Sequence, residues 1–220
     1  MAHIETCNWY IDPSILLDKA QGAVGELLAS IGSLSHQAFV QVYPGMIATV
    51  VAQQLSDKSY QSLLSKLPEE LFDYHIAMPD QLQLPLSQSK ISTIRTLQEL
   101  FVTGKLSESS LRSWDPVLRA ERLLLIKGIG PWSVQMMEML VFHNEDVFSV
   151  HDWGLQSAVL HLAGKSRQSL SNQEILALME RYYKVIAPWH KSSLVSFALW
   201  ELNRLPPERK DQLFGIWEGS

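Results

Sequence analysis

One carboxylate occupies a position from which it could support bond-breaking chemistry. Asp152 directly precedes the expected start of a helix at Trp153-Gly154-Leu155, where an N-cap residue stabilises the helix by roughly 1 kcal/mol. The N–H groups at a helix start and the positive end of its dipole also favour an ionised carboxylate. Such a carboxylate can stabilise an oxocarbenium-like sugar and orient water while a glycosidic bond breaks. The local pattern favours a cap, and the cap and catalytic roles are compatible.

A glycine turn about twenty residues upstream is a second candidate for ligand binding. Gly128 and Gly130 flank one apolar residue, and Pro131 occupies the first position of the next helix, where its missing N–H is not needed. The unsatisfied N–H groups of that helix face the turn. Together with the helix dipole they form a site for an anion such as a DNA phosphate. Most glycine turns only join two helices, so the turn alone is weak evidence for such a site.

The elements that must position these groups are helices. Asp115 is expected to cap a helix that starts at Pro116 and leads into the turn, and the following helix, 132–142, is apolar nearly all round and therefore expected to be buried. Helical spacing of apolar residues predicts further helices over about 14–31, 43–67, 68–76, 90–102, 153–162, 172–186 and 188–205. No segment shows the alternation of a strand. The predicted fold class is all-α, with about ten helices.

The composition limits the class of protein. The chain has 220 residues, a net charge of −5 and a sequence pI near 5.8, which argue against general coating of nucleic acid but allow a local basic face. The single Cys7 excludes an internal disulfide framework, a Cys-ligated iron–sulfur cluster and a cysteine-rich zinc site. Apolar runs are too short to cross a membrane, and residues 1–14 lack a signal-peptide pattern. We therefore expect an intracellular protein, in the cytoplasm or nucleoid, or in the nucleus of a eukaryote.

Several short segments occur in the order seen in one enzyme family. They are Leu-Ile-Lys-Gly-Ile-Gly-Pro-Trp-Ser at 125–133, Asp-Val-Phe-Ser-Val-His-Asp at 146–152, Ala-Gln-Gln-Leu-Ser at 52–56, Leu-Ser-x-x-Lys at 86–90, Pro-Trp at 188–189, and Trp200. Over residues 40–202 the chain therefore resembles the helix–hairpin–helix DNA glycosylases, and within them the 3-methyladenine DNA glycosylase II, or alkylpurine, branch. The interval of twenty residues from Trp132 to Asp152 matches the family pattern.

The resemblance implies a domain organisation and a partner. The fold would be a two-lobed helical bundle of the helix–hairpin–helix glycosylase type, with the active-site cleft between the lobes. Residues 1–220 would form a single glycosylase unit. Its first lobe would span about 36–150 and contain the hairpin 123–143, and its second would combine about 1–35 with 151–220. The partner would be damaged double-stranded DNA, bound by a monomer that does not associate with membranes.

The resemblance also implies roles for individual residues, with Asp152 as the catalytic carboxylate. The base pocket would be lined by Gln53, Trp132, Met136 and Trp200. The DNA contacts would come from Gln54, which would fill the gap left by the extruded nucleotide, and from Lys90, Lys127, Gly128, Gly130 and Ser133. A monovalent cation, Na⁺ or K⁺, would be held by the backbone carbonyls of Leu124, Ile126 and Ile129. No other cofactor would be required.

The branch of the family can be argued from one position. Related bifunctional lyases carry an amine nucleophile where this chain has Trp132, and an indole cannot form a Schiff base. We therefore expect a monofunctional glycosylase without AP-lyase activity. Its expected substrates are alkylated purines of the 3-methyladenine and 7-methylguanine type, flipped from duplex DNA during base excision repair. Because these bases are cationic, they need little general acid and favour an aromatic cradle, for which the seven tryptophans provide the means.

The match is incomplete near its C-terminal end. The Arg-Ser that follows Pro-Trp in the family is replaced by His190-Lys191-Ser192-Ser193, and the interval from Trp189 to Trp200 is two residues longer than the family pattern. Three alternatives therefore stay open. They are the same fold acting on hypoxanthine or an oxidised base, a non-catalytic helix–hairpin–helix DNA-binding module, and a helical protein–protein adaptor. Base release from damaged duplexes and salt-dependent DNA affinity distinguish them.

Overall fold

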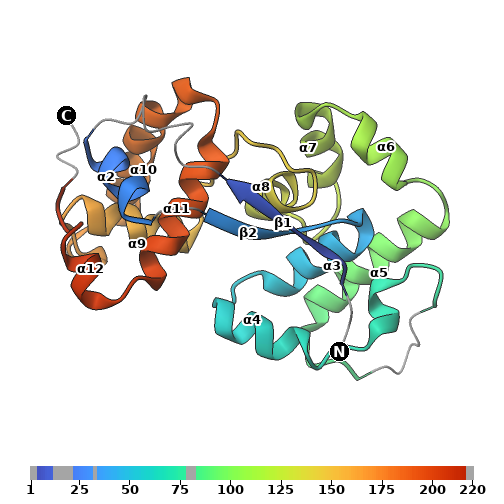
Figure 1. Cartoon of the computed structure of the whole chain (residues 1–220). Coiled ribbons are helices and arrows are strands. Elements are labelled where there is room, and N and C mark those ends of the chain that lie inside the picture. Colours follow the sequence, from blue (N-terminus) through green and yellow to red (C-terminus); the bar gives the residue numbers. More distant parts are fainter. Residues whose placement is uncertain (1–3, 12–21, 32–33, 78–82, 217–220) are drawn as a thin grey trace. The chain divides into compact units, whose positions relative to one another are not determined.

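The computed structural model describes residues 4–11, 22–31, 34–77 and 83–216, and helices dominate these ranges (Figure 1). The predicted helical fold class is confirmed. The prediction that the chain has no strands is wrong, because β1 (Thr6–Ile11) and β2 (Leu34–Phe39) pair in a two-stranded sheet. Neither segment, TCNWYI or LSHQAF, alternates between apolar and polar residues throughout, so its sequence lacks the period of two that indicates a strand.

The contacts within the chain divide it into two compact units. Unit 1 comprises residues 1–7 and 37–143, and unit 2 comprises residues 8–36 and 144–220. The division therefore falls inside both strands, after Cys7 and after His36. The sequence predicts lobes of residues 36–150 and of 1–35 with 151–220. Their boundary after residue 150 lies a few residues beyond the boundary between the units, which follows residue 143. Residues 144–150 belong to unit 2.

Unit 1 is built around a single buried helix. Its elements are α3 (Val42–Ala52), α4 (Asp57–Leu64), the 3₁₀ turn η1 (Glu69–Phe72), α5 (Gln88–Val102), α6 (Glu108–Ser113), α7 (Pro116–Leu124) and α8 (Pro131–Leu140). Every residue of α3 from Val42 to Val51 is buried, and the helix packs against α4, α5, α8 and η1. A helix that is apolar on all sides is stable only in such an interior position.

The predicted long helix from 43 to 67 is wrong, because the chain breaks between α3 and α4. Gln54 has a φ of 60°, in the left-handed region, which few non-glycine residues adopt. Ser56 then caps α4 by accepting a hydrogen bond from the Ser59 N–H. Apolar spacing continues across the break without a glycine or proline, so periodicity alone does not reveal it.

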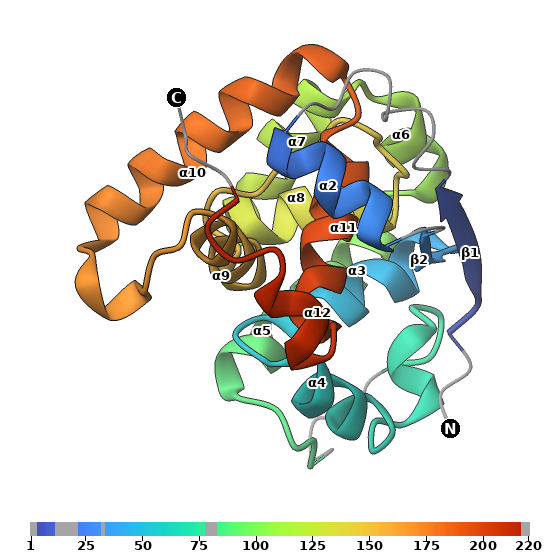
Figure 2. The same ribbon diagram turned by 60° about the vertical axis from the view of Figure 1, so that its left-hand side comes forward.

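Unit 2 packs its helices around α11. Its elements are α2 (Gly22–Ile31), α9 (Trp153–Leu162), η2 (Arg167–Ser169), α10 (Asn172–Ile186), η3 (Ala187–Trp189), α11 (Ser192–Arg204) and α12 (Pro207–Asp211). Both α9 and α2 contact α11, and α10 contacts α9 (Figure 2). Of the helix expected at 14–31, residues 22–31 form α2, and 14–21 lie outside the described residues. The helix expected at 188–205 begins at Ser192, after the turn η3.

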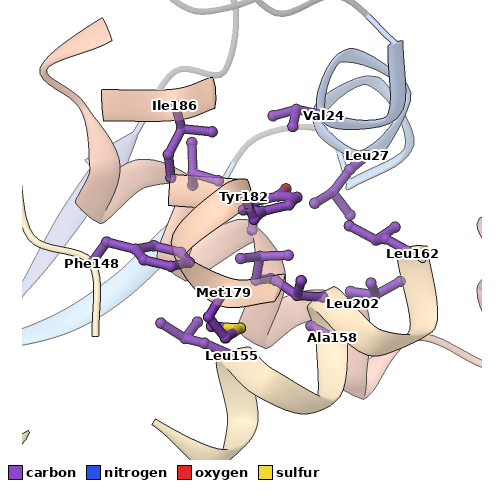
Figure 3. Close-up of a cluster of buried hydrophobic side chains, with 14 of the residues drawn as sticks. Val24, Leu27, Phe148, Leu155, Ala158, Leu162, Met179, Tyr182, Ile186 and Leu202 are labelled. Carbon is purple, nitrogen blue, oxygen red and sulfur yellow. The ribbon is translucent and has the colours of Figure 1, made fainter. Parts of the chain in front are cut away.

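The core of unit 2 surrounds the helix that starts after Asp152. Leu155, Ala158 and Leu162 of α9 face Tyr182 and Met179 of α10 and the side chains of α2 (Figure 3). Burial of this apolar face fixes the direction of α9. The position of Asp152 at its N-terminus is therefore set by packing. Among the residues that the structure describes, none of the helices has both the length and the apolar character needed to span a bilayer.

Candidate active site

Asp152 is a buried carboxylate that caps α9. Its Oδ1 accepts a hydrogen bond of 2.8 Å from the backbone N–H of Leu155 and one of 3.0 Å from Nε1–H of Trp200. The residue is 8% exposed. The predicted N-cap is therefore confirmed, and a second donor from α11 is added to it. Two N–H groups aimed at one oxygen fix the orientation of the carboxylate.

Gly154 makes the close approach of the Asp152 carboxylate and the Trp200 indole possible. A Cβ on Gly154 would lie 3.1 Å from Asp152 Oδ1 and 3.1 Å from Cδ1 of Trp200. The carbonyl of Gly154 also accepts a hydrogen bond of 2.9 Å from Nδ2 of Asn203, which ties the first turn of α9 to α11. The small residue after Asp152-Trp153 therefore leaves room for the contact between the indole and the carboxylate.

The segment that leads to Asp152 is held along one face of α11 by three serines that are 0% exposed. Ser192 Oγ donates to Asp146 Oδ1 at 2.6 Å, and Ser193 Oγ accepts from the Val147 N–H at 3.0 Å. Ser196 Oγ lies 3.2 Å from the Val147 carbonyl. Residues 192, 196 and 200 recur every four positions and so share a helix face. The stretch that departs from the family pattern therefore anchors the segment that presents Asp152.

Aromatic side chains surround Trp200 within unit 2. The ring centroids of His36 and Phe197 are 4.4 Å apart and nearly parallel, and the Trp200 ring lies 5.4 Å from His36 and 5.7 Å from Phe197. Trp200 was predicted to line the base pocket. The structure brings it to Asp152, with its N–H donated to the carboxylate. The role of its ring toward a base stays a prediction.

The hairpin (residues 123–143) belongs to unit 1 and depends on the absence of a side chain at Gly128. Its φ is 91°, and a Cβ there would lie only 1.9 Å from Thr93 Oγ1. The Thr93 hydroxyl lies 3.2 Å from the carbonyl of Lys127 and 3.0 Å from that of Ser89. Gly130 is the N-cap of α8, with φ −107°, and a Cβ there would meet nothing within 4 Å. The first glycine is thus required by packing, whereas the second leaves open space beside the N-terminus of α8.

A buried ion pair joins the two helices of the hairpin. Arg119 of α7 donates to both carboxylate oxygens of Glu138 of α8, at 2.5 and 2.9 Å, and both side chains are under 10% exposed. Arg119 also donates to the carbonyls of Leu111 and Trp114, and its Cζ lies 4.0 Å from the centroid of the Phe142 ring. These contacts satisfy the guanidinium and fix α7 against α8.

Of the predicted site residues, Gln53 packs against the hairpin and contacts Ser133 within it. Gln53 Nε2 donates to the carbonyl of Gly128 and to Ser133 Oγ, both at 2.9 Å. Ser133 is 3% exposed, so its hydroxyl lies inside this packing, and its predicted contact with a phosphate stays a prediction. The amide N–H₂ of Gln53 joins the turn after α3 to the glycine turn, and the place of Gln53 in a base pocket stays a prediction.

Lys90 contacts the backbone of the turn that follows α3. Its Nζ donates to the carbonyls of Val51 and Gln53, both at 2.8 Å, and so closes the C-terminal end of α3. Partial burial lowers the pKa of this ammonium. The contact holds the backbone of the turn that carries Gln54, and a direct contact between Lys90 and DNA stays a prediction.

The remaining predicted residues of unit 1 differ in exposure. Gln54 is exposed at the turn after α3, and Lys127 is exposed beside Gly128. Trp132 is partly buried at the start of α8, and Met136 is 3% exposed on the same helix. The places of Trp132 and Met136 in a base pocket stay predictions, as do the DNA contacts of Gln54 and Lys127.

The three carbonyls predicted to hold a cation lie where the chain leaves α7. Leu124 is the last residue of that helix, and the Ile126 carbonyl accepts a hydrogen bond of 3.0 Å from the Ile129 N–H. Carbonyls at a helix C-terminus lack partners within the helix and carry its negative end, so they suit a cation. In the described part of the chain, no group of three or more His, Cys, Asp or Glu side chains is arranged to hold a metal ion.

Sequence reasoning missed the side chains that support these sites. Thr93, Arg119 and Glu138 hold the hairpin, and Asp146 and Ser193 hold the segment before Asp152. A charged residue at 138 inside an otherwise apolar helix was a signal for a buried partner. Nothing local to the sequence identifies Arg119 as that partner, or places Thr93 beside Gly128.

Two known proteins are similar in sequence to this chain. No family model matches the chain. It is 22% identical over 177 residues to the DNA-3-methyladenine glycosylase 1 of Schizosaccharomyces pombe, covering 74% of this chain and 73% of that protein. It is 23% identical over 182 residues to the alkylbase DNA glycosidase-like protein mag2 of the same organism, covering 77% of this chain and 81% of that protein.

Solved structures show the same fold. A DNA-3-methyladenine glycosidase from Bacillus halodurans superposes with a TM-score of 0.65 at 22% identity, covering 88% of this chain and 91% of that chain. The Schizosaccharomyces pombe 3-methyladenine DNA glycosylase Mag1, solved in complex with abasic DNA, gives a TM-score of 0.70 at 19% identity, covering 88% of this chain and 97% of that chain. The fold is therefore that of a DNA glycosylase. The chain is thus similar in sequence to two proteins named as alkylbase glycosylases and similar in fold to two solved 3-methyladenine glycosylases.

Proposed function

We propose that this protein is a monofunctional DNA glycosylase of base excision repair that hydrolyses the N-glycosidic bond of alkylated purines flipped from duplex DNA. The observation that carries the proposal is the geometry at Asp152, a buried carboxylate with two N–H donors on one oxygen. The segment and helix face that hold it belong to one packed unit. Its relatives are named for action on 3-methyladenine and alkylbases, which supports this substrate class.

The proposed chemistry needs one carboxylate and no nucleophilic amine. As the N-glycosidic bond breaks, its electron pair moves onto the cationic base, which leaves neutral and therefore needs no proton. Asp152 stabilises the positive charge that develops on the sugar and accepts a proton from the water that attacks C1′. The products are the free base and an abasic site. The position that holds an amine in bifunctional relatives is Trp132, so the proposed enzyme does not cleave the strand.

The hairpin is proposed to hold the DNA backbone. Gly130 leaves open space at the N-terminus of α8, where unsatisfied N–H groups and the helix dipole favour a phosphate. Lys127 is exposed next to this turn and is proposed to contribute a positive charge. Gln54 is proposed to fill the space left by the flipped nucleotide. The exposed, left-handed turn at Gln54, held by Lys90 and Gln53, supports this role.

A monovalent cation and a monomeric state complete the proposal. The carbonyls of Leu124, Ile126 and Ile129 are proposed to bind Na⁺ or K⁺, which would add positive charge beside the phosphate site. No other cofactor is required by the chemistry above. The protein would act as a monomer in the compartment that contains the genomic DNA.

Release of methylated bases from alkylated duplex DNA tests the proposal. We expect the protein to release 3-methyladenine and 7-methylguanine and to leave the strand uncleaved until alkali is added. A panel of duplexes with hypoxanthine or 8-oxoguanine separates the proposal from the same fold acting on neutral lesions. Binding to abasic DNA without release of any base would instead indicate a non-catalytic DNA-binding module. An adaptor would show no salt-dependent DNA affinity.

A further inference from the structure

The residue that follows Asp152 is an unusually exposed tryptophan. Trp153 is the first residue of α9 and is 67% exposed. Large aromatic side chains are normally buried, and an exposed one next to a catalytic group is a candidate contact for a ligand or partner. The core of unit 2 does not need this indole, because Leu155, Ala158 and Val159 of the same helix supply the buried face.

A charged residue supports the indole. Arg167 Cζ lies 5.6 Å from the centroid of the Trp153 ring, within the range of a cation–π interaction. Arg167 Nη2 donates to Gln156 Oε1 at 2.5 Å, and Gln156 Nε2 donates to the Val150 carbonyl at 2.8 Å. The guanidinium is thus fixed by the segment that presents Asp152. Within the described ranges, no carboxylate forms an ion pair with Arg167.

The position of the Trp153–Arg167 pair determines which part of a bound DNA it can contact. Adjacent Cα atoms are about 3.8 Å apart, so the Trp153 indole lies within about 10 Å of the Asp152 carboxylate. In the proposed function Asp152 faces the deoxyribose of the flipped nucleotide. Since base pairs are spaced about 3.4 Å along the duplex axis, the nucleotides next to the lesion lie within reach of Trp153. An aromatic face backed by a positive charge suits a nucleobase in a negatively charged strand.

We propose that Trp153, backed by Arg167, forms a stacking platform for a base next to the excised nucleotide. This inference rests on the proposed function, because it takes Asp152 to face the target sugar. The free face of the indole stacks on the neighbouring base, and the Arg167 guanidinium attracts the phosphate beside it. The platform would hold the strand while the target nucleotide is flipped, so it contributes to affinity and positioning and not to the bond-breaking step.

The first test is affinity for a duplex that contains a stable abasic-site analogue, which no variant can turn over. Stacking on an aromatic side chain is typically worth 1–3 kcal/mol per base, so Trp153→Ala should weaken binding about 5- to 150-fold. Trp153→Phe keeps an aromatic face and should stay within about threefold of wild type. Arg167→Gln should weaken binding and reduce the slope of log affinity against log salt concentration by about the amount that one phosphate contact contributes. Phe214→Ala and Lys184→Gln, which change an exposed aromatic and an exposed basic residue of the same unit, are the matched controls and should bind normally.

A fluorescent base analogue, 2-aminopurine, placed 5′ or 3′ of the abasic analogue, reports stacking directly. We expect wild type and Trp153→Phe to change its emission at one of the two positions, and Trp153→Ala to lose that change. Wild-type affinity of Trp153→Ala, or the same emission change with this variant, would overturn the inference and point to a protein partner for the exposed indole. If wild type releases no base but these results hold, the proposed function fails and the platform stands. If the wild-type protein does not bind the abasic duplex, the platform is overturned.

Discussion

At the residue scale, the carboxylate of Asp152 is oriented by one backbone donor and one side-chain donor. The backbone donor comes with the helix start and is therefore available to any N-cap aspartate. The Trp200 N–H is different, because it comes from another helix and a residue 48 positions away. Its presence distinguishes a positioned carboxylate from an ordinary cap.

Removing this donor while keeping an aromatic ring tests its contribution. Trp200→Phe should lower the single-turnover excision rate about 10- to 150-fold, because a hydrogen bond to a charged group is typically worth 1.5–3 kcal/mol. The control is Trp189→Phe, which makes the same substitution at another partly buried tryptophan that packs against the core of unit 2. Equal rates for Trp200→Phe and wild type would show that the indole N–H does not support the reaction.

Substitution of the two glycines of the hairpin should have opposite effects on stability and on DNA affinity. Gly128→Ala should destabilise the fold by about 1–3 kcal/mol or more, because it combines a φ of 91° with a Cβ 1.9 Å from Thr93 Oγ1. Gly130→Ala has ordinary backbone angles and open space, so its unfolding midpoint should stay near wild type, while its affinity for abasic DNA should fall. Urea unfolding and fluorescence anisotropy measure the two effects. Loss of stability in Gly130→Ala would contradict the assignment of its open space to DNA.

Much of the candidate site could be predicted from residue types, but the partners could not. Asp152 and the glycine turn follow from a local motif and its spacing. Gln53 was predicted to line the base pocket, and Ser133 and Lys90 were predicted to contact DNA; the structure adds hydrogen bonds from all three to groups of unit 1. Two of these contacts, between Gln53 and Ser133 and between Lys90 and the Val51 carbonyl, join residues 80 and 39 positions apart, and local sequence does not encode such pairings.

At the element scale, the hairpin is held by the Arg119–Glu138 pair as well as by apolar packing. Glu138→Ala should destabilise the protein by about 3–5 kcal/mol, because it leaves a buried guanidinium without its counter-charge. Glu121→Ala on α7 removes an exposed carboxylate and should change stability by under about 0.5 kcal/mol. Urea unfolding of both variants checks the expectation, which a small effect of Glu138→Ala would refute.

Helices were predictable where apolar spacing and caps agreed, as in α7, α9 and α10. The predicted cap at Asp115 is confirmed by its hydrogen bonds to the first turn of α7, and Ser87 and Ser171 cap α5 and α10 in the same way. The break between α3 and α4 was missed because it has no glycine or proline. The strands were missed because neither segment alternates between apolar and polar residues throughout. Both failures occur where tertiary contacts override local preference.

At the scale of the whole molecule, the predicted all-helical class and glycosylase fold agree with the structure, although the two-stranded sheet was not expected. The identity to the Schizosaccharomyces pombe DNA-3-methyladenine glycosylase 1 is 22%, so the proposed function rests on the geometry of the site more than on overall sequence similarity. A chain with a net charge of −5 has no general attraction to DNA, so the proposed DNA binding depends on local features such as the hairpin and the exposed Trp153.

The central claim is that the Asp152 carboxylate acts on the sugar. Asp152→Asn keeps an oxygen that can accept from the Leu155 and Trp200 N–H groups, so the protein should fold and bind abasic DNA as wild type does. Removing the negative charge should nevertheless reduce single-turnover excision of 7-methylguanine about 100- to 1,000-fold. The decisive measurement is therefore this rate, with the melting temperature and abasic-DNA affinity of the same samples. A rate near wild type in a folded, DNA-binding Asp152→Asn variant would contradict the account.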